Sequence, residues 1–233
     1  MLYARCCNNN KADTVLSLFE QAVSERGLPS RVRSDYGMEN YHVGAYMIQH
    51  RGGNRGSILT GSSVHNTRVE RAHRDIFSGV LVFYSRIFEE LEYEELLDIE
   101  DDVHLFCLHY VYTNRINRSL NEFMLQMNHH PVSTERNLSP LQMWEKGMLE
   151  ALRFPEATVL QTPEDLDSFG IDTDGQYSVD DEDYQVDVSP PNLNLPVECY
   201  EMLPSWDEND GLSGKDLFQR CVDIVIQCLE NQN

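Results

Sequence analysis

Two acidic residues, Asp35 and Glu70, have the type and the surroundings of ligands for a divalent metal ion. Asp35 follows a short segment expected to be a strand, and Glu70 lies in an expected helix whose first turns are polar. Carboxylates in such positions hold Mg²⁺ or Mn²⁺ for the cleavage or transfer of phosphodiesters. Two carboxylates bind one Mg²⁺ only weakly, because that ion keeps several of its waters. The two residues therefore predict an incomplete metal site for phosphodiester chemistry.

Both residues also have ordinary structural interpretations. Asp35 could serve as a turn or helix-cap residue, and Glu70 could form a surface ion pair with Arg71 or Arg74. The spacing of the two acids carries little weight by itself, because the chain holds 39 acidic residues. The flanking segments, residues 33–40 and 64–71, carry most of the information.

Basic and polar residues near the two acids are candidates for contacts with nucleic-acid phosphates. A glycine-rich loop expected at residues 51–57 has the charge and the flexibility for such contacts. An ordinary solvated surface is the alternative. The candidates are Arg51, Arg55, His65, Asn66, Arg68, Arg71 and Arg74.

The elements that must position these residues alternate between short strands and helices over the first third of the chain, which predicts an α/β class. Hydrophobic periodicity and punctuation by glycine and proline define them. The expected elements are a strand at Leu2–Cys6, a helix from Asn10 to Gly27, a strand at Arg31–Ser34, a helix at Tyr41–His50, a strand at Ile58–Thr60 and a long helix from about Val64, capped by Ser62 or Ser63. The predicted buried face of that long helix consists of Phe77, Val80, Leu81, Tyr84, Phe88 and Leu91.

The remaining two thirds of the chain predict helices and a polar tail. A second long helix is expected from His104 to Met127, so residues 1–150 form an α/β core with a helical extension. Residues 151–212 are rich in Pro and Asp and are expected to be a largely disordered acidic linker. Residues 213–233 predict an amphipathic helix that could dock on a protein partner.

Charge is unevenly distributed along the chain. Residues 1–150 hold 15 Lys and Arg against 20 Asp and Glu, a net charge of −5, whereas residues 151–233 hold 3 against 19, a net charge of −16. Such a tail repels polyanions at long range and predicts weak, salt-dependent DNA binding. Six cysteines without a Cys-x-x-Cys pair, and no secretory or membrane-spanning pattern, predict an intracellular protein, with the nucleus as one location.

Several ordered motifs together resemble the integrase core domain of retroviral-type integrases and DDE transposases, within the RNase H-like superfamily. They are the segments 8–10, 27–35, 61–71, 128–131 and 139–144, so the resemblance covers about residues 1–149. It implies that Asp35 is the second catalytic Asp and Glu70 the catalytic Glu, with Mg²⁺ or Mn²⁺ as cofactor. DNA is the implied partner, and a homo-oligomer the implied assembly. In that family the first catalytic Asp lies on a preceding strand, so the resemblance predicts a truncated core with a reduced sheet.

Two classes of function remain open from the sequence. One is a mobile-element-derived integrase or transposase, ancestrally capable of DNA strand transfer and impaired by the incomplete triad. The other is a non-catalytic protein that binds nucleic acid or a protein partner, or a decayed fragment of a transposable element. A metal-dependent strand transfer that Asp35→Asn abolishes would separate the two classes.

Overall fold

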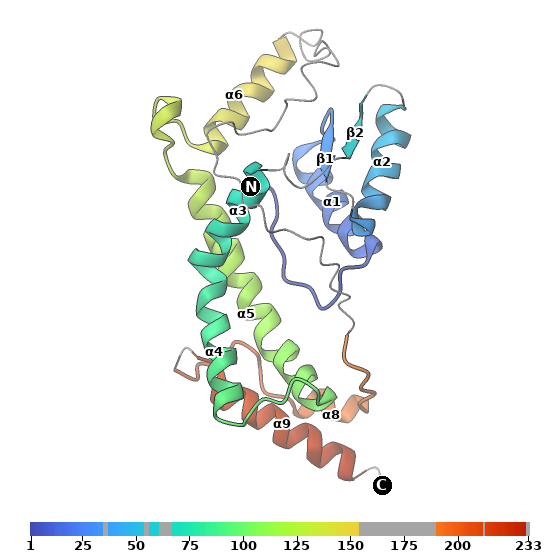
Figure 1. Cartoon of the computed structure of the whole chain (residues 1–233), viewed down its shortest axis with the longest axis vertical. Coiled ribbons are helices and arrows are strands. Elements are labelled where there is room, and N and C mark those ends of the chain that lie inside the picture. The colour runs from blue at the N-terminus through green and yellow to red at the C-terminus, as the bar shows by residue number, and fades with distance from the viewer. Residues whose placement is uncertain (35–36, 54–55, 61–66, 154–189, 212, 232–233) are drawn as a thin grey trace. The chain divides into compact units, whose positions relative to one another are not determined.

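The computed structural model describes residues 1–34, 37–53, 56–60, 67–153, 190–211 and 213–231 (Figure 1). Contacts between Cα atoms divide the chain into two compact units. The αβ unit contains Met1–Tyr3, Lys11–Asp75 and Glu122–Val186, and the helical unit contains Ala4–Asn10, Ile76–Asn121 and Asp187–Asn233.

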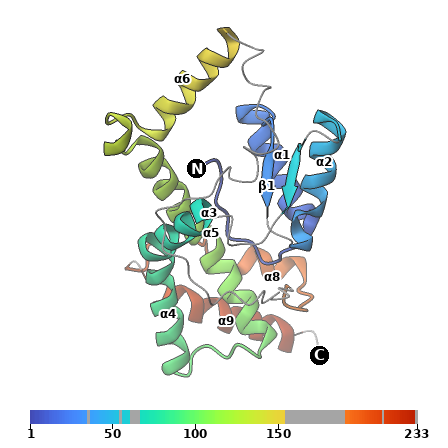
Figure 2. The same cartoon turned by 45° about the horizontal axis from the view of Figure 1, so that its top comes forward.

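The sheet of the αβ unit has two described strands. Strands β1 (Val32–Ser34) and β2 (Ile58–Thr60) are parallel, and Val32 pairs with Ile58 while Ser34 pairs with Thr60. Both were predicted from the sequence, β1 to within one residue. Helices α1 (Ala12–Arg26) and α2 (Tyr41–Arg51) lie beside the strands in both views (Figures 1 and 2). The short 3₁₀ helix η1 (Met38–Asn40) leads into α2.

The core of this unit forms where one face of α1 meets one face of α2. Phe19, Val43 and Met47 are buried there, with Val32 of β1 packed against them. Two glycines end the helices as predicted, Gly27 with φ 84° after α1 and Gly52 with φ 92° after α2. Glycine adopts these angles without the steric cost that a Cβ atom imposes, so the chain can reverse towards each strand.

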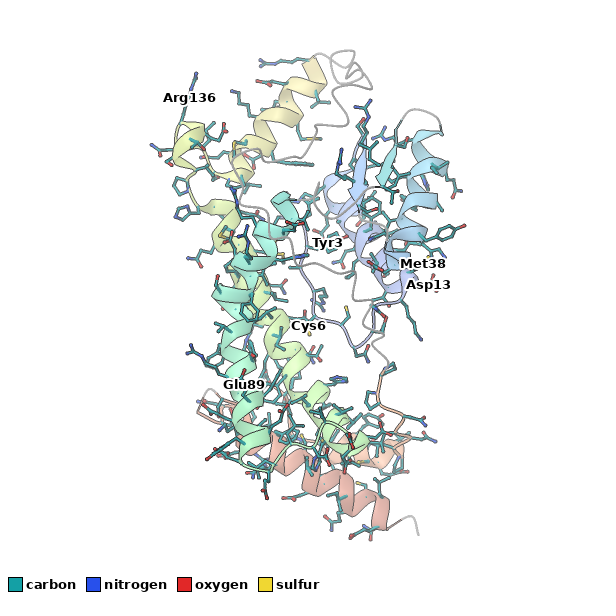
Figure 3. The ribbon with its side chains drawn as sticks, in the orientation of Figure 1. Tyr3, Cys6, Asp13, Met38, Glu89 and Arg136 are labelled. Atoms are coloured by element: carbon teal, nitrogen blue, oxygen red, sulfur yellow. The ribbon has the colours of Figure 1, made fainter. Side chains whose placement is uncertain are left out.

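The predicted strand at Leu2–Cys6 is not formed, which is a correction to the sequence analysis. The segment has no regular secondary structure and pairs with no strand among the described residues. Within the helical unit, Asn117 satisfies the Cys6 backbone instead: the Cys6 N–H donates to Asn117 Oδ1 at 2.8 Å, and Asn117 Nδ2 donates to the Cys6 carbonyl at 3.0 Å. Figure 3 shows Cys6 on this segment. A side-chain amide thus supplies the two hydrogen bonds that a neighbouring strand would make.

The long helix after β2 is continuous but changes its pitch. Helix α3 (Thr67–Ile76) passes through a π-helical turn, η3 (Phe77–Leu81), into α4 (Val82–Tyr93). A π turn takes up an extra residue and so rotates the helix faces on either side of it. Val80, Tyr84 and Leu91 are buried as predicted, whereas Phe77 is 53% exposed, contrary to the prediction. The predicted cap residues Ser62 and Ser63 lie outside the described residues.

The helical unit is built on α4 and on α5 (Asp102–His129), which contributes residues to both units. Helix α9 (Lys215–Glu230) forms as predicted, and its Lys215 Nζ pairs with Glu90 of α4 at 2.7 Å. Leu217 and Phe218 of α9 are fully buried. The apolar face that was expected to dock on a partner protein is therefore covered within the unit itself.

Part of the predicted acidic linker is packed, which is a second correction. Residues 190–211 contain helix α8 (Val197–Met202), and Leu195, Cys199 and Leu203 are buried. Cys199 lies in α8, while Leu195 precedes the helix and Leu203 follows its last residue, so apolar side chains on and beside the helix are buried despite the acidic composition around them. Residues 154–189 of that linker lie outside the described residues.

Helix α6 (Pro140–Arg153) follows the 3₁₀ turn η4 (Ser133–Glu135) in the αβ unit. A reciprocal capping box fixes its start: the Gln142 N–H donates to Ser139 Oγ at 3.3 Å, and the Ser139 N–H donates to Gln142 Oε1 at 2.9 Å. Pro140 occupies the first helical position, where its missing N–H has no cost. None of the described helices is long and apolar enough to cross a membrane.

Candidate metal and nucleic-acid site

The candidate metal site starts where β1 ends. Because β1 and β2 are parallel, Ser34 and its partner Thr60 stand together at the carboxyl edge of the sheet. Ligand-binding groups in α/β proteins commonly follow strands at this edge. Asp35 is the next residue after Ser34 and itself lies outside the described residues. Its role as a metal ligand therefore stays a prediction.

A second carboxylate, that of Glu39, lies close to this point of the chain. The Glu39 side chain folds back over Gly37 and fills the space that a Cβ atom on Gly37 would need. Asn40 Nδ2 donates a hydrogen bond to Glu39 Oε1 at 3.3 Å, and Glu39 is half-buried. Gly37 therefore lets a negative charge lie against the backbone two residues after Asp35.

Glu70 lies in the first turn of α3, the helix that follows β2 in the chain, and is half-buried. Acidic residues are also favoured in a first turn by the helix dipole, so its place agrees with both interpretations given above. Among the described residues, no three His, Cys, Asp or Glu side chains are grouped to hold a metal ion. Asp35 is not one of those described residues.

The predicted phosphate-contacting residues fall into three groups. Arg71 and Arg74 are exposed on α3. Arg51 is exposed, but its guanidinium binds its own chain: Nη2 donates to the Leu28 carbonyl at 2.5 Å and Nε to the Pro29 carbonyl at 3.1 Å. Arg51 therefore fixes the turn before β1. Arg55, His65, Asn66 and the side chain of Arg68 lie outside the description.

A cavity in the αβ unit was not predicted from the sequence. It measures about 250 Å³ and is lined by Met1, Leu2, Arg26, Asn128, Pro140, Leu141 and Trp144. Asn128 Nδ2 donates to the Met1 carbonyl at 2.8 Å and holds this wall of the cavity. Asn128, Pro140, Leu141 and Trp144 lie in the motif segments 128–131 and 139–144, but their spacing in the sequence does not show that they line one cavity.

In the helical unit, sequence reasoning missed a buried charge. Arg115 lies on the inner face of α5 and is only 6% exposed. The position of Arg115 on the buried face could have been inferred from the sequence, because Arg115 follows the buried Val111 and Tyr112 at helical spacing. A charged residue at such a position requires a partner. That partner, Asp210, is far away in the sequence, so the pairing could not be predicted.

Four of the six cysteines are buried in the helical unit: Cys107, Cys199, Cys221 and Cys228. Burial raises the pKa of the Cys221 thiol to about 12, and burial together with a hydrogen bond to Cys228 raises the pKa of Cys199 to about 12. Burial also raises the pKa of Cys107 strongly. Thiols of this kind are protonated at neutral pH and serve as core residues.

Comparison with known families gives the class of the protein. A family model described as an integrase core domain matches residues 1–157, more than half of the chain. The chain therefore belongs to the integrase core domain family, as its motifs predicted. Neither a search of curated proteins nor a search of solved structures found a match. The family suggests an RNase H-like fold, and the small parallel sheet is consistent with a reduced sheet.

Proposed function

We propose that the chain is a mobile-element-derived integrase-like protein whose ancestral reaction is Mg²⁺-dependent DNA strand transfer. The observation that carries the proposal is the family match, because the matched residues 1–157 include both Asp35 and Glu70 with their flanking motifs. The parallel strands support it, since β1 ends directly before Asp35 and Glu70 follows β2 on the next helix.

In this proposal Asp35 and Glu70 hold Mg²⁺ or Mn²⁺, because hard carboxylate oxygens are the ligands that these ions prefer. The bound ion would activate the attacking oxygen and stabilise the leaving oxygen of a DNA phosphate. Glu39, held over Gly37, adds negative charge near Asp35 and borders the substrate. The exposed guanidinium groups of Arg71 and Arg74 contribute to the contacts with the DNA backbone.

We further propose that these 233 residues by themselves catalyse strand transfer poorly. Only two of their carboxylates match the family triad, and two carboxylates do not clamp a phosphate between two metal ions as the family mechanism requires. Metal binding and salt-dependent DNA binding are the properties that should persist. DNA is thus the proposed partner.

A metal titration and a cleavage assay test the proposal together. Mn²⁺ binding to the full chain is followed by electron paramagnetic resonance, and cleavage is followed on an end-labelled DNA duplex. We expect Mn²⁺ binding that Asp35→Asn and Glu70→Gln each weaken at least about tenfold, with little cleavage. Glu135→Gln, an exposed acid in η4, is the matched control and should bind as the parent does.

Each outcome of that experiment is informative. DNA cleavage that Asp35→Asn abolishes would overturn the proposal of impaired catalysis and would show that the chain is an active strand-transfer enzyme. Binding of Mn²⁺ that neither substitution changes would overturn the assignment of the two ligands. A chain that binds no Mn²⁺ would leave only the non-catalytic binding function.

DNA binding is tested separately by fluorescence anisotropy of a labelled duplex at low salt. Arg71→Ala and Arg74→Ala should each weaken binding and each reduce the slope of log affinity against log salt by about one. Arg86→Ala, an exposed arginine on α4, should leave the slope unchanged. Absence of binding at low salt would count against a nucleic-acid partner.

A further inference from the structure

The cavity of the αβ unit combines apolar walls with one arginine. Leu2, Leu141 and Trp144 supply apolar side chains, and Arg26 lines it from the last turn of α1. All of the lining residues belong to this unit, and the volume is about 250 Å³. An apolar cavity of about 150 Å³ holds one benzene ring. This cavity therefore has room for a ring with a short substituent.

Arg26 gives the cavity a positive charge. Among the described residues that line the cavity, no other side chain is charged. Arg26 is exposed, and within the described part of the chain no acidic side chain forms an ion pair with it. The planar guanidinium carries its donors in a fork that matches the two oxygens of a carboxylate. Its charge is therefore open to an anionic ligand.

Trp144 supplies a flat apolar surface at a fixed position. It lies just after the start of α6, which the capping box between Ser139 and Gln142 holds in place. The indole is 39% exposed, so part of its ring system is open to a ligand. Aromatic rings pack favourably against an indole, either offset and parallel or edge to face. An aromatic body is therefore the best match for this wall.

Asn128 limits how polar that body can be. Its Oδ1 accepts a hydrogen bond from the Met1 nitrogen at 2.6 Å, and its Nδ2 donates to the Met1 carbonyl at 2.8 Å. Because both ends of the amide already have partners, the polar edge of a nucleobase would be poorly satisfied here. The second negative charge of a phosphate monoester would also lack a partner beside the single guanidinium of Arg26.

We propose that this cavity binds a small aromatic monocarboxylate, whose ring lies against Trp144 and whose carboxylate pairs with Arg26. The ring displaces water from Leu2 and Leu141, and the guanidinium donates two hydrogen bonds to the carboxylate. The site shares no residue with the proposed metal and DNA sites. Failure of either proposal therefore leaves the other intact.

Nuclear magnetic resonance of the full ¹⁵N-labelled chain, with phenylacetate as the probe, is the first test. The indole N–H signals of Trp144 and Trp206 are distinguished by the variant Trp144→Phe. We expect phenylacetate to shift the Trp144 signal and to leave that of Trp206, which belongs to the helical unit, unmoved. No shift of the Trp144 signal up to about 10 mM phenylacetate, a concentration at which weak ligands already bind, would overturn the proposal.

Variants of Arg26 test the role of its charge. Arg26→Gln should weaken phenylacetate binding at least about tenfold, and Arg26→Lys should weaken it less, because lysine keeps the charge but loses the fork of donors. Arg153→Gln, at an exposed arginine of α6 that does not line the cavity, should bind as the parent does. Arg26 is exposed, so its variants should fold, which circular dichroism checks. Equal affinities in Arg26→Gln and the parent would overturn the assignment of Arg26.

A comparison of probes tests the ligand class without any substitution. Phenylacetamide has nearly the same shape but no charge, and it should bind at least about tenfold more weakly than phenylacetate. Thymidine monophosphate should also bind more weakly, for the reasons given by Asn128 and Arg26. Equal binding of the acid and the amide would overturn the recognition of a carboxylate. Tighter binding of the nucleotide would overturn the ligand class and assign the cavity to nucleic acid.

Discussion

Arg115 and Asp210 form a buried ion pair in which Nη1 lies 3.1 Å from Oδ1 and both side chains are only 7% exposed. The other nitrogens of the guanidinium hold the same segment, because Nε donates to the Trp206 carbonyl and Nη2 to the Glu208 carbonyl. One arginine on α5 thus fixes the segment that leads into α9. A residue nearly 100 positions earlier in the chain decides where this acidic segment lies.

Removal of the acid from this pair should be costly. Asp210→Ala leaves a buried guanidinium without its counter-charge, so the free energy of unfolding should fall by about 3–5 kcal/mol in urea denaturation. Glu208→Gln breaks the exposed pair with Arg220, whose Nη1 lies 2.6 Å from Glu208 Oε1, and should change stability little. Similar losses in the two variants would show that burial of the pair is unimportant.

Substitutions at two glycines with similar backbone angles should show how much stability is lost to backbone strain and how much to a side-chain clash. Gly214 and Gly211 have φ of 83° and 82°. A Cβ atom on Gly214 would lie 2.9 Å from Tyr112 Cε1, whereas one on Gly211 would meet nothing within 4 Å. Gly211→Ala should cost about 1–2 kcal/mol from backbone conformation alone. Gly214→Ala should cost clearly more, as measured by thermal and urea unfolding; equal costs would mean that Tyr112 moves aside freely.

The stability of the helical unit should fall in mild acid because of His109. Burial lowers the pKa of His109, and within the described structure its buried Nδ1 has no hydrogen-bond partner. The unfolded chain therefore binds a proton more readily than the folded chain as the pH drops below about 6.5, the ordinary histidine value. The neutral ring makes its full contribution to stability above this ordinary histidine pKa, and that contribution is lost as the pH falls below it.

In His109→Leu the free energy of unfolding should fall less between about pH 7.5 and about pH 5.5, a range that spans the ordinary histidine pKa. His130→Leu, at an exposed histidine, should keep the slope of the parent. An unchanged slope in His109→Leu would assign the acid sensitivity to other groups.

Thiol labelling should report on the core of the helical unit. The four buried cysteines should resist iodoacetamide in the native state, because burial excludes the reagent and raises the pKa of Cys107, Cys199 and Cys221. Half-buried Cys6 and Cys7 should react first, and Cys6 more slowly since burial also raises its pKa. Mass spectrometry should find all six labelled only after unfolding; early labelling of Cys221 would contradict this packing.

The sequence by itself determined the local elements and the family of this protein. Gly27 and Gly52 end their helices where predicted, β2 and α9 form where their patterns place them, and the motifs of the integrase core were readable without coordinates. These features depend on residues that are neighbours in the chain. Asp35 and Glu70 were also identified in this way, and their chemistry stays a prediction for the metal titration to test.

Only the tertiary structure decided which distant residues satisfy one another. The Cys6 backbone is paired by Asn117 rather than by a strand, Arg115 finds its counter-charge at Asp210, and the acidic residues 190–211 pack through three apolar side chains. The helix also contains a π turn at Phe77–Leu81, and Phe77 at its start is exposed although the sequence pattern predicted it to be buried. Such outcomes depend on the cost of burying unpaired polar groups, and that cost is set by contacts that local sequence patterns do not specify.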